Sequence, residues 1–308
     1  MLLGPTGTGK SALAVEVAER LGGEIVGCDA LQVYRGLDAA TAKPSAAERR
    51  RVPHHLIDHR DPRQDYTLAR FVAEADDAIA SIAARGRIPL VAGGTGLYLR
   101  GLLRGIVDAP ARDSRLRQRI GRLRARFGTP RLHRWLQGLD PRSAARVAAA
   151  DTHRVTRALE LALGGGPSWS ERLEQQGNWR GAGERYRALK IGLDVADRER
   201  HGAILDARVE RFFGEGLVEE VRKLHAAGVP PGANAFRAIG YRQVLQALRT
   251  GADPAALVGE VQRSTRRYAR KQRSWFRGET GVEWLAAEEP LPMLTAQVVE
   301  RWREHTDR

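Results

Sequence analysis

The sequence predicts an α/β protein in which a parallel sheet is flanked by helices and an all-helical segment is inserted into the chain. Short apolar runs alternate with helical patterns over the first hundred residues, which is typical of parallel strands joined by crossover helices. A glycine-rich turn connects the first run to the first helix. From Ala111 to Lys190 the strand pattern disappears, and 18 Arg and Lys residues stand against 7 Asp and Glu.

The expected elements follow from the period of the apolar residues. Strands are predicted at Leu2–Leu3, Glu24–Cys28, Arg87–Ala92 and Arg187–Leu193. Helices are predicted at Ser11–Arg20 and Leu68–Ala84, and two long ones at about 197–227 and 241–277. Residues 1–110 and 187–308 would then form the α/β core, and residues 111–186 the helical insertion.

Composition narrows the class of protein. The chain has 308 residues, of which 42% are hydrophobic, so it has enough apolar side chains for a sizeable core. A formal charge of +14 favours a polyanionic partner such as nucleic acid. The single cysteine, Cys28, excludes an internal disulfide framework. No run approaches the roughly 18 apolar residues of a membrane span, so we expect a soluble, cytoplasmic and monomeric protein.

The glycine-rich turn fits the pattern G-x-x-x-x-G-K-[ST], with an apolar strand before it and an amphipathic helix after it. Its residues are Gly4, Pro5, Thr6, Gly7, Thr8, Gly9, Lys10 and Ser11. Glycines let backbone N–H groups surround an anion, and the helix N-terminus adds its positive dipole end. Lys10 supplies a charge to phosphate oxygens, and the Ser11 hydroxyl is a candidate ligand for Mg²⁺. A P-loop NTPase-like sheet that binds a diphosphate or triphosphate is therefore expected.

Asp29 is the acid that follows the strand Glu24–Cys28. Because the carboxyl ends of parallel strands line the ligand crevice, Asp29 should face the phosphate loop. The later strand ends in Gly93-Gly94-Thr95, without the acid that a typical ATPase carries there. Asp29 could bind Mg²⁺, act as a general base, or only cap a turn.

Three further features leave alternatives open. His54-His55 suggests either a metal ligand pair or hydrogen-bonded packing, and packing is favoured because no second ligand cluster has suitable spacing. Arg208 and Arg211 could reach a diphosphate or form surface ion pairs. The basic run 263–277 contains Tyr268, Trp275 and Phe276, so it could bind RNA or cover core aromatics with its aliphatic stems.

Together these residues carry a resemblance to a known family, the bacterial tRNA dimethylallyltransferases (tRNA isopentenyltransferases). The motifs run in order over nearly the whole chain. They are Gly4–Ser11, Asp29–Asp38, Thr41–Pro44, Val52–Asp58, Gly93–Tyr98, Asp151–Arg157, Arg237–Gln243 and Arg270–Gln272. Ala30 stands where serine is usual, and His153 where glutamine is usual.

The resemblance implies an activity. Members of this family transfer a dimethylallyl group from dimethylallyl diphosphate to the exocyclic amine of the adenosine 3′ of a tRNA anticodon. It implies that Asp29 is the base that takes a proton from the amine and that Thr95 lies beside it. It further implies that Gly4–Ser11 hold the diphosphate together with Mg²⁺.

The resemblance also implies contacts with the anticodon stem-loop of tRNA, the expected partner of the helical insertion. In the core these residues are Asp29, Ala30, Leu31, Gln32, Thr95, Arg237, Ala238, Ile239, Gly240, Tyr241 and Arg242. In the insertion they are Arg117, His153, Arg154, Val155, Thr156 and Arg157. The base would have to leave the loop stack to reach a buried site, at a cost of a few kcal/mol.

Two other functions compete with this interpretation. A small-molecule kinase would use ATP on the same loop and would be indifferent to tRNA. A non-catalytic RNA-binding protein would bind tRNA regardless of Asp29 and form no product.

Overall fold

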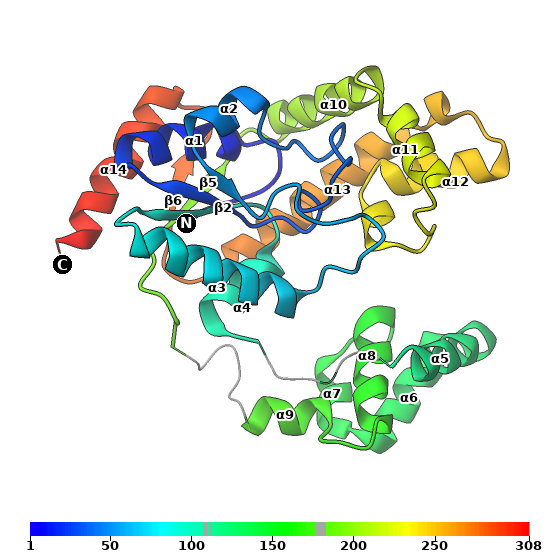
Figure 1. Cartoon of the computed structure of the whole chain (residues 1–308). Helices are drawn as coiled ribbons and strands as arrows, with labels where there is room; N and C mark the ends of the chain where they lie inside the picture. The colour runs from blue at the N-terminus through cyan, green and yellow to red at the C-terminus, as the bar shows by residue number, and fades with distance from the viewer. Residues whose placement is uncertain (107–109, 111–112, 176–182, 308) are drawn as a thin grey trace. The chain divides into compact units, whose positions relative to one another are not determined.

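Within residues 1–106, 110, 113–175 and 183–307, which the computed structural model describes, six parallel strands form one sheet. The strands are β1 (Leu2–Leu3), β2 (Glu24–Gly27), β3 (His54–His55), β4 (Pro89–Ala92), β5 (Lys190–Asp194) and β6 (Val282–Ala286). Their order is β3-β2-β4-β1-β5-β6, so the strand before the phosphate loop is central (Figure 1). The predicted parallel α/β sheet is confirmed.

Helices cover both faces of this sheet (Figure 1). Helices α1 (Lys10–Leu21) and α14 (Leu291–Thr306) pack together on one face, while α3 (Leu68–Ala84) lies on the other. Leu13 of α1 and Val298 of α14 join Ile191 of β5 in one hydrophobic core cluster. Burial of these apolar side chains fixes the strand ends from which the loops of the site emerge.

The prediction of two long helices in the second half of the chain is wrong, because each of the two segments contains a break. Helix α10 (Arg198–Gly214) is separated from α11 (Leu217–Ala226) by Gly216, whose φ of 96° cannot continue a helix. Helix α12 (Tyr241–Thr250) ends at Gly251 with φ 73°, a left-handed cap. A 3₁₀ turn, η2 (Pro254–Leu257), then leads into α13 (Val258–Arg277).

Other predicted elements hold, and several were not predicted. The helix at Leu68–Ala84 has the predicted bounds, while β2 ends one residue before Cys28. The unpredicted elements are β3, β6, α14, α2 (Ala46–Arg51), α4 (Gly96–Arg104) and the 3₁₀ turn η1 (Asn234–Arg237). In β6 only Leu285 is buried, so this edge strand lacks the alternating apolar pattern that would have indicated it.

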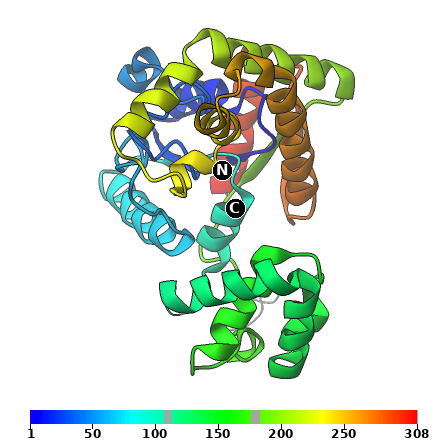
Figure 2. The same ribbon diagram turned by 90° about the vertical axis from the view of Figure 1, so that its right-hand side faces the viewer.

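The chain divides into two compact units, Met1–Leu103 with Tyr186–Arg308, and Arg104–Arg185. In the described part of the second unit the secondary structure is entirely helical, as Figure 2 shows. Its helices are α5 (Ser114–Phe127), α6 (Thr129–Leu139), α7 (Pro141–Arg146), α8 (Thr152–Leu163) and α9 (Trp169–Gln175). Ile120, Leu132, Leu136 and Val155 form its core.

Three of these helices begin with an aspartate that accepts a backbone N–H from the first turn. They are Asp113 for α5, Asp140 for α7 and Asp151 for α8. Such a cap satisfies one of the free donors at a helix start.

A helix that crosses a membrane must be both long and apolar, and no helix of the described residues meets both conditions.

The ends of β2 and β4 approach each other closely at Gly93. A Cβ atom built on Gly93 would lie 2.1 Å from the Cys28 carbonyl oxygen. Only glycine allows this approach, which brings the segment after β2, with Asp29, next to the segment after β4, with Thr95.

Replacement of Gly93 by alanine should therefore destabilise the core unit. We expect Gly93→Ala to lower the free energy of unfolding by roughly 1–3 kcal/mol, because two backbones must separate. Gly214→Ala is the matched control, since a Cβ there meets no atom within 4 Å. Chemical denaturation measures both, and equal stability of the two variants would contradict the close approach.

Candidate functional site

A pocket of about 400 Å³ opens at the carboxyl ends of β1, β2 and β4. It brings together the phosphate loop, Asp29 and the first part of the Arg237 motif. The sequence-predicted residues that line it are Thr6, Gly7, Thr8, Gly9, Lys10, Ser11, Asp29, Leu31, Gln32, Arg237, Ala238 and Ile239. All of them belong to the core unit.

The phosphate loop connects β1 to α1, and its shape depends on glycine. Gly4, Gly7 and Gly9 all have positive φ, of 135°, 80° and 78°. A Cβ on Gly4 would lie 2.3 Å from the Leu193 carbonyl oxygen of β5. The loop is therefore packed directly on the sheet, and Gly9 begins α1 so that the helix N-terminus points into the pocket.

Lys10 is folded back onto the phosphate loop. Its Nζ donates to the Pro5 carbonyl oxygen at 2.5 Å and lies 3.4 Å from Thr8 Oγ1. Burial, followed by the nearby positive charge of Arg208, lowers the pKa of Lys10 to about 7, while the charge of Asp29 opposes the shift. A bound phosphate group would restore the protonated form, because it adds negative charge at close range.

Thr6 is fixed by side chains from two distant helices. Arg208 of α10 donates to Thr6 Oγ1 at 2.9 Å, and the Thr6 N–H donates to Gln272 Oε1 at 2.9 Å. His201 Nε2 donates to the Thr6 carbonyl oxygen at 2.9 Å. Arg208 lines the pocket, whereas Arg211 is exposed and does not line it, and the contact of Arg208 with a diphosphate stays a prediction.

Asp29 caps a turn and faces the pocket at the same time. Its Oδ1 accepts the N–H groups of Leu31 and Gln32 at 2.8 and 3.3 Å. Its Oδ2 accepts no hydrogen bond from the described residues. Burial raises the pKa of Asp29, although the two backbone hydrogen bonds and the charges of Arg208 and Lys10 oppose the shift. A carboxylate with a raised pKa is a better proton acceptor for catalysis.

Thr95 contacts the segment that carries Asp29 rather than the pocket itself. The Ala30 N–H donates to Thr95 Oγ1 at 3.2 Å, and the Thr95 N–H donates to the Cys28 carbonyl oxygen at 3.3 Å. Neither Thr95 nor Ala30 lines the pocket. In this structure Thr95 therefore orients the turn, and its role beside the reacting atoms stays a prediction.

The second half of the Arg237 motif lies away from the pocket. Gly240 is buried, Tyr241 is fully buried and Arg242 is exposed. The Tyr241 hydroxyl donates to Glu220 and accepts the Ala40 N–H at 3.4 Å. The predicted tRNA contacts of these three residues are not tested by this geometry.

In the helical unit, the predicted tRNA-binding residues have different surroundings. His153 and Arg154 are exposed, Thr156 is half-buried, and Val155 is in the core. Arg117 Nε lies 3.5 Å and Arg157 Nη1 3.3 Å from the carboxylate of Glu160, whose side chain is buried. Two of the predicted cationic contacts are therefore anchored by one acid.

Several pocket residues were not assigned a site by the sequence. They are Ala12, Ala40, Thr41, Ala42, Ala92, Gly93, Gly94, Phe212, Thr265, Tyr268 and Gln272. Thr265, Tyr268 and Gln272 share one face of α13 at spacings of three and four. A stripe of hydrogen-bonding side chains within this basic helix is the signal that could have indicated a pocket-facing side.

The remaining open features are explained in part. His54 Nδ1 bonds the Val52 carbonyl oxygen at 2.8 Å, and His55 Nε2 lies 2.7 Å from Glu24 Oε2. In α13, the buried Arg273 pairs with Asp194 at 2.7 Å and Arg266 pairs with Asp206. Arg263, Arg267, Arg270 and Lys271 are exposed, and their contact with RNA stays a prediction.

The fold and the pocket define an α/β protein of the P-loop type whose phosphate-binding loop opens onto a half-buried carboxylate. A family model described as IPP transferase matches residues 32–279. The chain is 49% identical over 289 residues to a tRNA dimethylallyltransferase of Anaeromyxobacter sp. (strain Fw109-5), and the match covers 93% of each chain. It is 48% identical to that of Anaeromyxobacter dehalogenans (strain 2CP-C), covering 98% of this chain and 99% of the relative.

Solved structures of similar fold belong to enzymes of the same kind. The tRNA isopentenylpyrophosphate transferase of Bacillus halodurans matches with a TM-score of 0.72 at 30% identity, covering 99% of this chain and 95% of that one. A eukaryotic dimethylallyltransferase acting on tRNA matches with a TM-score of 0.78 at 27% identity. The match covers 97% of this chain and 76% of that one. The chain belongs to the IPP transferase family.

The lowered pKa of Lys10 predicts a pH dependence of donor binding. Above the pKa of about 7 the free protein holds Lys10 neutral, so binding of a diphosphate must take up a proton. We expect the affinity for dimethylallyl diphosphate to fall by up to about tenfold per pH unit between about pH 7.5 and 9.5. Titration calorimetry in buffers of different ionisation enthalpy measures the affinity and the proton uptake together.

Lys10→Arg is the control for that titration, because a guanidinium keeps its charge throughout this range. Its diphosphate affinity should therefore depend less on pH than that of the wild type. A wild-type affinity that does not change with pH, or the same slope in both proteins, would contradict the assignment.

Proposed function

We propose that this protein transfers a dimethylallyl group from dimethylallyl diphosphate to the exocyclic amine of the adenosine that follows the anticodon in tRNA, releasing diphosphate. The observation that carries the proposal is the shared pocket, in which a phosphate-binding loop and the Asp29 carboxylate lie together. The names of the relatives, tRNA dimethylallyltransferases at 48–49% identity over almost the full chain, support the same substrates.

The loop would stabilise the leaving group. As the C–O bond of the donor breaks, negative charge grows on the diphosphate. The phosphate loop, Lys10 and Arg208 line the same pocket, so the loop N–H groups and the two cations would stabilise this charge more in the transition state than in the ground state. The apolar side chains of Phe212 and Ile239 in the same pocket suit the hydrocarbon chain of the donor.

Asp29 would act on the acceptor. An adenine amine is a weak nucleophile, and it loses a proton once its nitrogen is alkylated. The Oδ2 atom of Asp29 is available to accept that proton, since the turn uses only Oδ1. The new N–C bond forms as the C–O bond breaks, and the proton ends on Asp29 before it passes to solvent.

The pocket also fits a Mg²⁺ ion bound with the diphosphate. The Ser11 hydroxyl lines the pocket directly after Lys10 and bonds no described residue, and an oxygen donor of this kind suits a hard cation. Ser11 would hold the ion together with phosphate oxygens, and the ion would supply further neutralisation of the departing charge.

The basic helical unit would bind the tRNA stem-loop. His153 and Arg154 are exposed at the start of α8, where cationic side chains and helix N–H groups can reach phosphates. Contacts of this kind give affinity that falls steeply with salt.

Asp29 gives the most direct test of the chemistry. Asp29→Asn keeps an oxygen that can accept the Leu31 and Gln32 N–H groups, but it removes the base. We expect both Asp29→Asn and Asp29→Ala to lower the rate of transfer by about 10²–10⁴-fold. The assay measures a single turnover with Mg²⁺, in which label passes from dimethylallyl diphosphate to unmodified tRNA.

The same assay separates the alternatives. Wild-type rates in Asp29→Asn would remove Asp29 from the mechanism. Binding of tRNA without any labelled product would favour a non-catalytic RNA-binding protein. Turnover of ATP that is indifferent to tRNA would favour a kinase.

A second prediction concerns the helical unit. The double variant His153→Ala/Arg154→Ala should weaken tRNA binding and reduce the salt slope, log K against log salt, by about 1, because one phosphate contact is lost. Arg142→Ala, which removes an exposed arginine paired with Glu174, is the control and should leave the slope unchanged. An unchanged slope in the double variant would place the tRNA elsewhere.

A further inference from the structure

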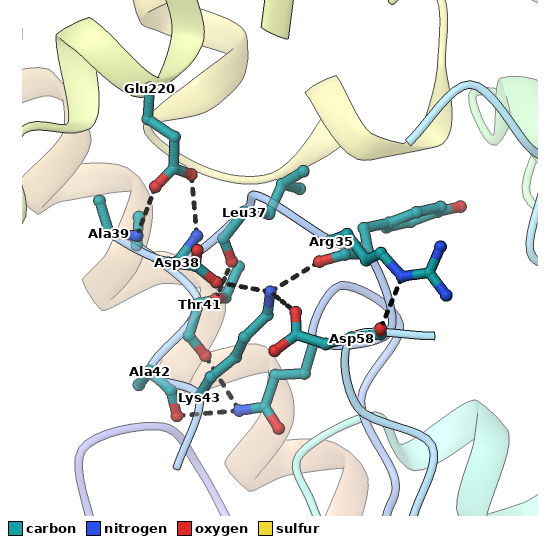
Figure 3. A network of polar contacts seen from close by, with 12 residues as sticks. Arg35, Leu37, Asp38, Ala39, Thr41, Ala42, Lys43, Asp58 and Glu220 are labelled. Atoms are coloured by element: carbon teal, nitrogen blue, oxygen red, sulfur yellow. Dashed lines mark hydrogen bonds and ion pairs between the residues drawn. The ribbon is translucent and has the colours of Figure 1, made fainter. Parts of the chain in front are cut away.

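Two segments outside the phosphate loop form walls of the pocket. One is the loop Ala40–Ala42, and the other is the stretch Arg237–Ile239. They are about two hundred residues apart in the sequence, so a tertiary contact must set their spacing. Figure 3 shows Glu220 of α11 bonded to Asp38 and Ala39, directly before the first of these segments (Figure 3).

Glu220 joins the two walls through three donors. Its carboxylate accepts the Asp38 N–H at 2.8 Å and the Ala39 N–H at 3.0 Å. Tyr241 follows the second wall by two residues, and its hydroxyl donates to the same carboxylate. That hydroxyl also accepts the Ala40 N–H at 3.4 Å, which closes a ring of contacts between the walls.

Tyr241 is well placed to hold the two walls together. Its side chain is completely buried, with 0% of its surface exposed. Burial and the adjacent carboxylate of Glu220 raise the pKa of Tyr241, so the hydroxyl remains a donor at all working pH values. Gly240, directly before it, has φ 92° and packs against Leu217 of α11.

Lys43 fixes the other end of the first wall. Its buried ammonium donates to the Tyr34 carbonyl oxygen at 2.6 Å and to Asp38 Oδ1 at 2.7 Å, and it also pairs with Asp58 (Figure 3). The loop is therefore held at Asp38 from two sides, by Glu220 through the backbone and by Lys43 through the side chain.

Gln32 transmits the position of this wall to Asp29. Its Nε2 donates to the carbonyl oxygens of Thr41 and Ala42, both at 3.0 Å. Its backbone N–H donates to Asp29 Oδ1. Among the described residues, no hydrogen bond joins Ala40–Ala42 to the phosphate loop. A shift of this wall would therefore disturb Asp29 and leave the diphosphate cradle in place.

We propose that Tyr241 and Glu220 are positioning residues for the acceptor half of the reaction. They hold the wall Ala40–Ala42 against Gln32, which orients the Asp29 carboxylate toward the adenosine, and they do not contribute to donor binding. This inference rests on the proposed transfer to tRNA.

The test compares two variants that each remove one buried hydroxyl from a carboxylate. Tyr241→Phe breaks the bond to Glu220. Tyr66→Phe breaks the 2.9 Å hydrogen bond from the buried Tyr66 to Glu74. This tyrosine does not line the pocket. Each variant loses one bond to a carboxylate, and Tyr241→Phe also loses the longer bond from the Ala40 N–H, so both should lower Tm and Tyr241→Phe should lower it slightly more.

Steady-state transfer kinetics separate a positioning role from a merely structural one, because a merely structural role would not change kcat/KM for tRNA selectively. Tyr241→Phe should lower kcat/KM for tRNA by about tenfold, while the Kd for dimethylallyl diphosphate stays within about twofold of wild type. Tyr66→Phe should leave both unchanged. An equal effect of the two variants on tRNA kinetics, or a loss of donor affinity in Tyr241→Phe, would overturn the inference.

Glu220→Gln provides a second route to the same conclusion. If Tyr241 acts through Glu220, the double variant Glu220→Gln/Tyr241→Phe should lose little more activity than the more damaged single variant. Fully additive losses would overturn the coupling. Absence of transfer by the wild-type protein would instead mean that the proposed function itself fails.

Discussion

The balance of charge between one carboxylate and two cations is the constraint on which this pocket depends. Asp29, Lys10 and Arg208 all lie in the same partly enclosed space, where a charge is costly unless an opposite charge lies nearby. Arg208 lowers the pKa of Lys10, and Asp29 opposes that shift. When Lys10 is protonated, positive charge exceeds negative charge among these three side chains, and an incoming diphosphate would correct the imbalance at the place where charge must later be stabilised.

The sheet order makes this arrangement possible. Because β1 lies between β4 and β5, and β4 lies between β1 and β2, the loops after β1, β2 and β4 emerge side by side. Gly93 lets the ends of β2 and β4 come together, and Gly4 lets the phosphate loop rest on β5. Helices α10 and α13 then add Arg208 and Gln272 to Thr6 from the other half of the chain. Asp29 combines a structural role with its proposed catalytic one, since it both caps its own turn and faces the pocket.

Much of the fold and the pocket could be predicted from the sequence, for physical reasons that are specific to each part. The phosphate loop and Asp29 are local features, because a glycine-rich turn between a strand and a helix, and an acid at a strand end, are visible in a few consecutive residues. The breaks at Gly216 and Gly251 were not predicted, because a helix pattern on both sides conceals a glycine with positive φ. The tie between Tyr241 and Glu220 could not be predicted, since it joins side chains from helices whose packing the sequence does not display. The stripe of hydrogen-bonding side chains on α13 could have indicated a pocket-facing side, but the sequence does not show which loops that side would meet.

The central claim is that the diphosphate cradle and the Asp29 carboxylate serve one reaction centre. A crystal structure with a non-reactive thio analogue of dimethylallyl diphosphate and an anticodon stem-loop tests this most directly. The account predicts the diphosphate on the Gly4–Ser11 loop and the extruded adenine amine within about 3 Å of Asp29 Oδ2. An adenine bound away from Asp29, or a diphosphate outside the loop, would contradict it.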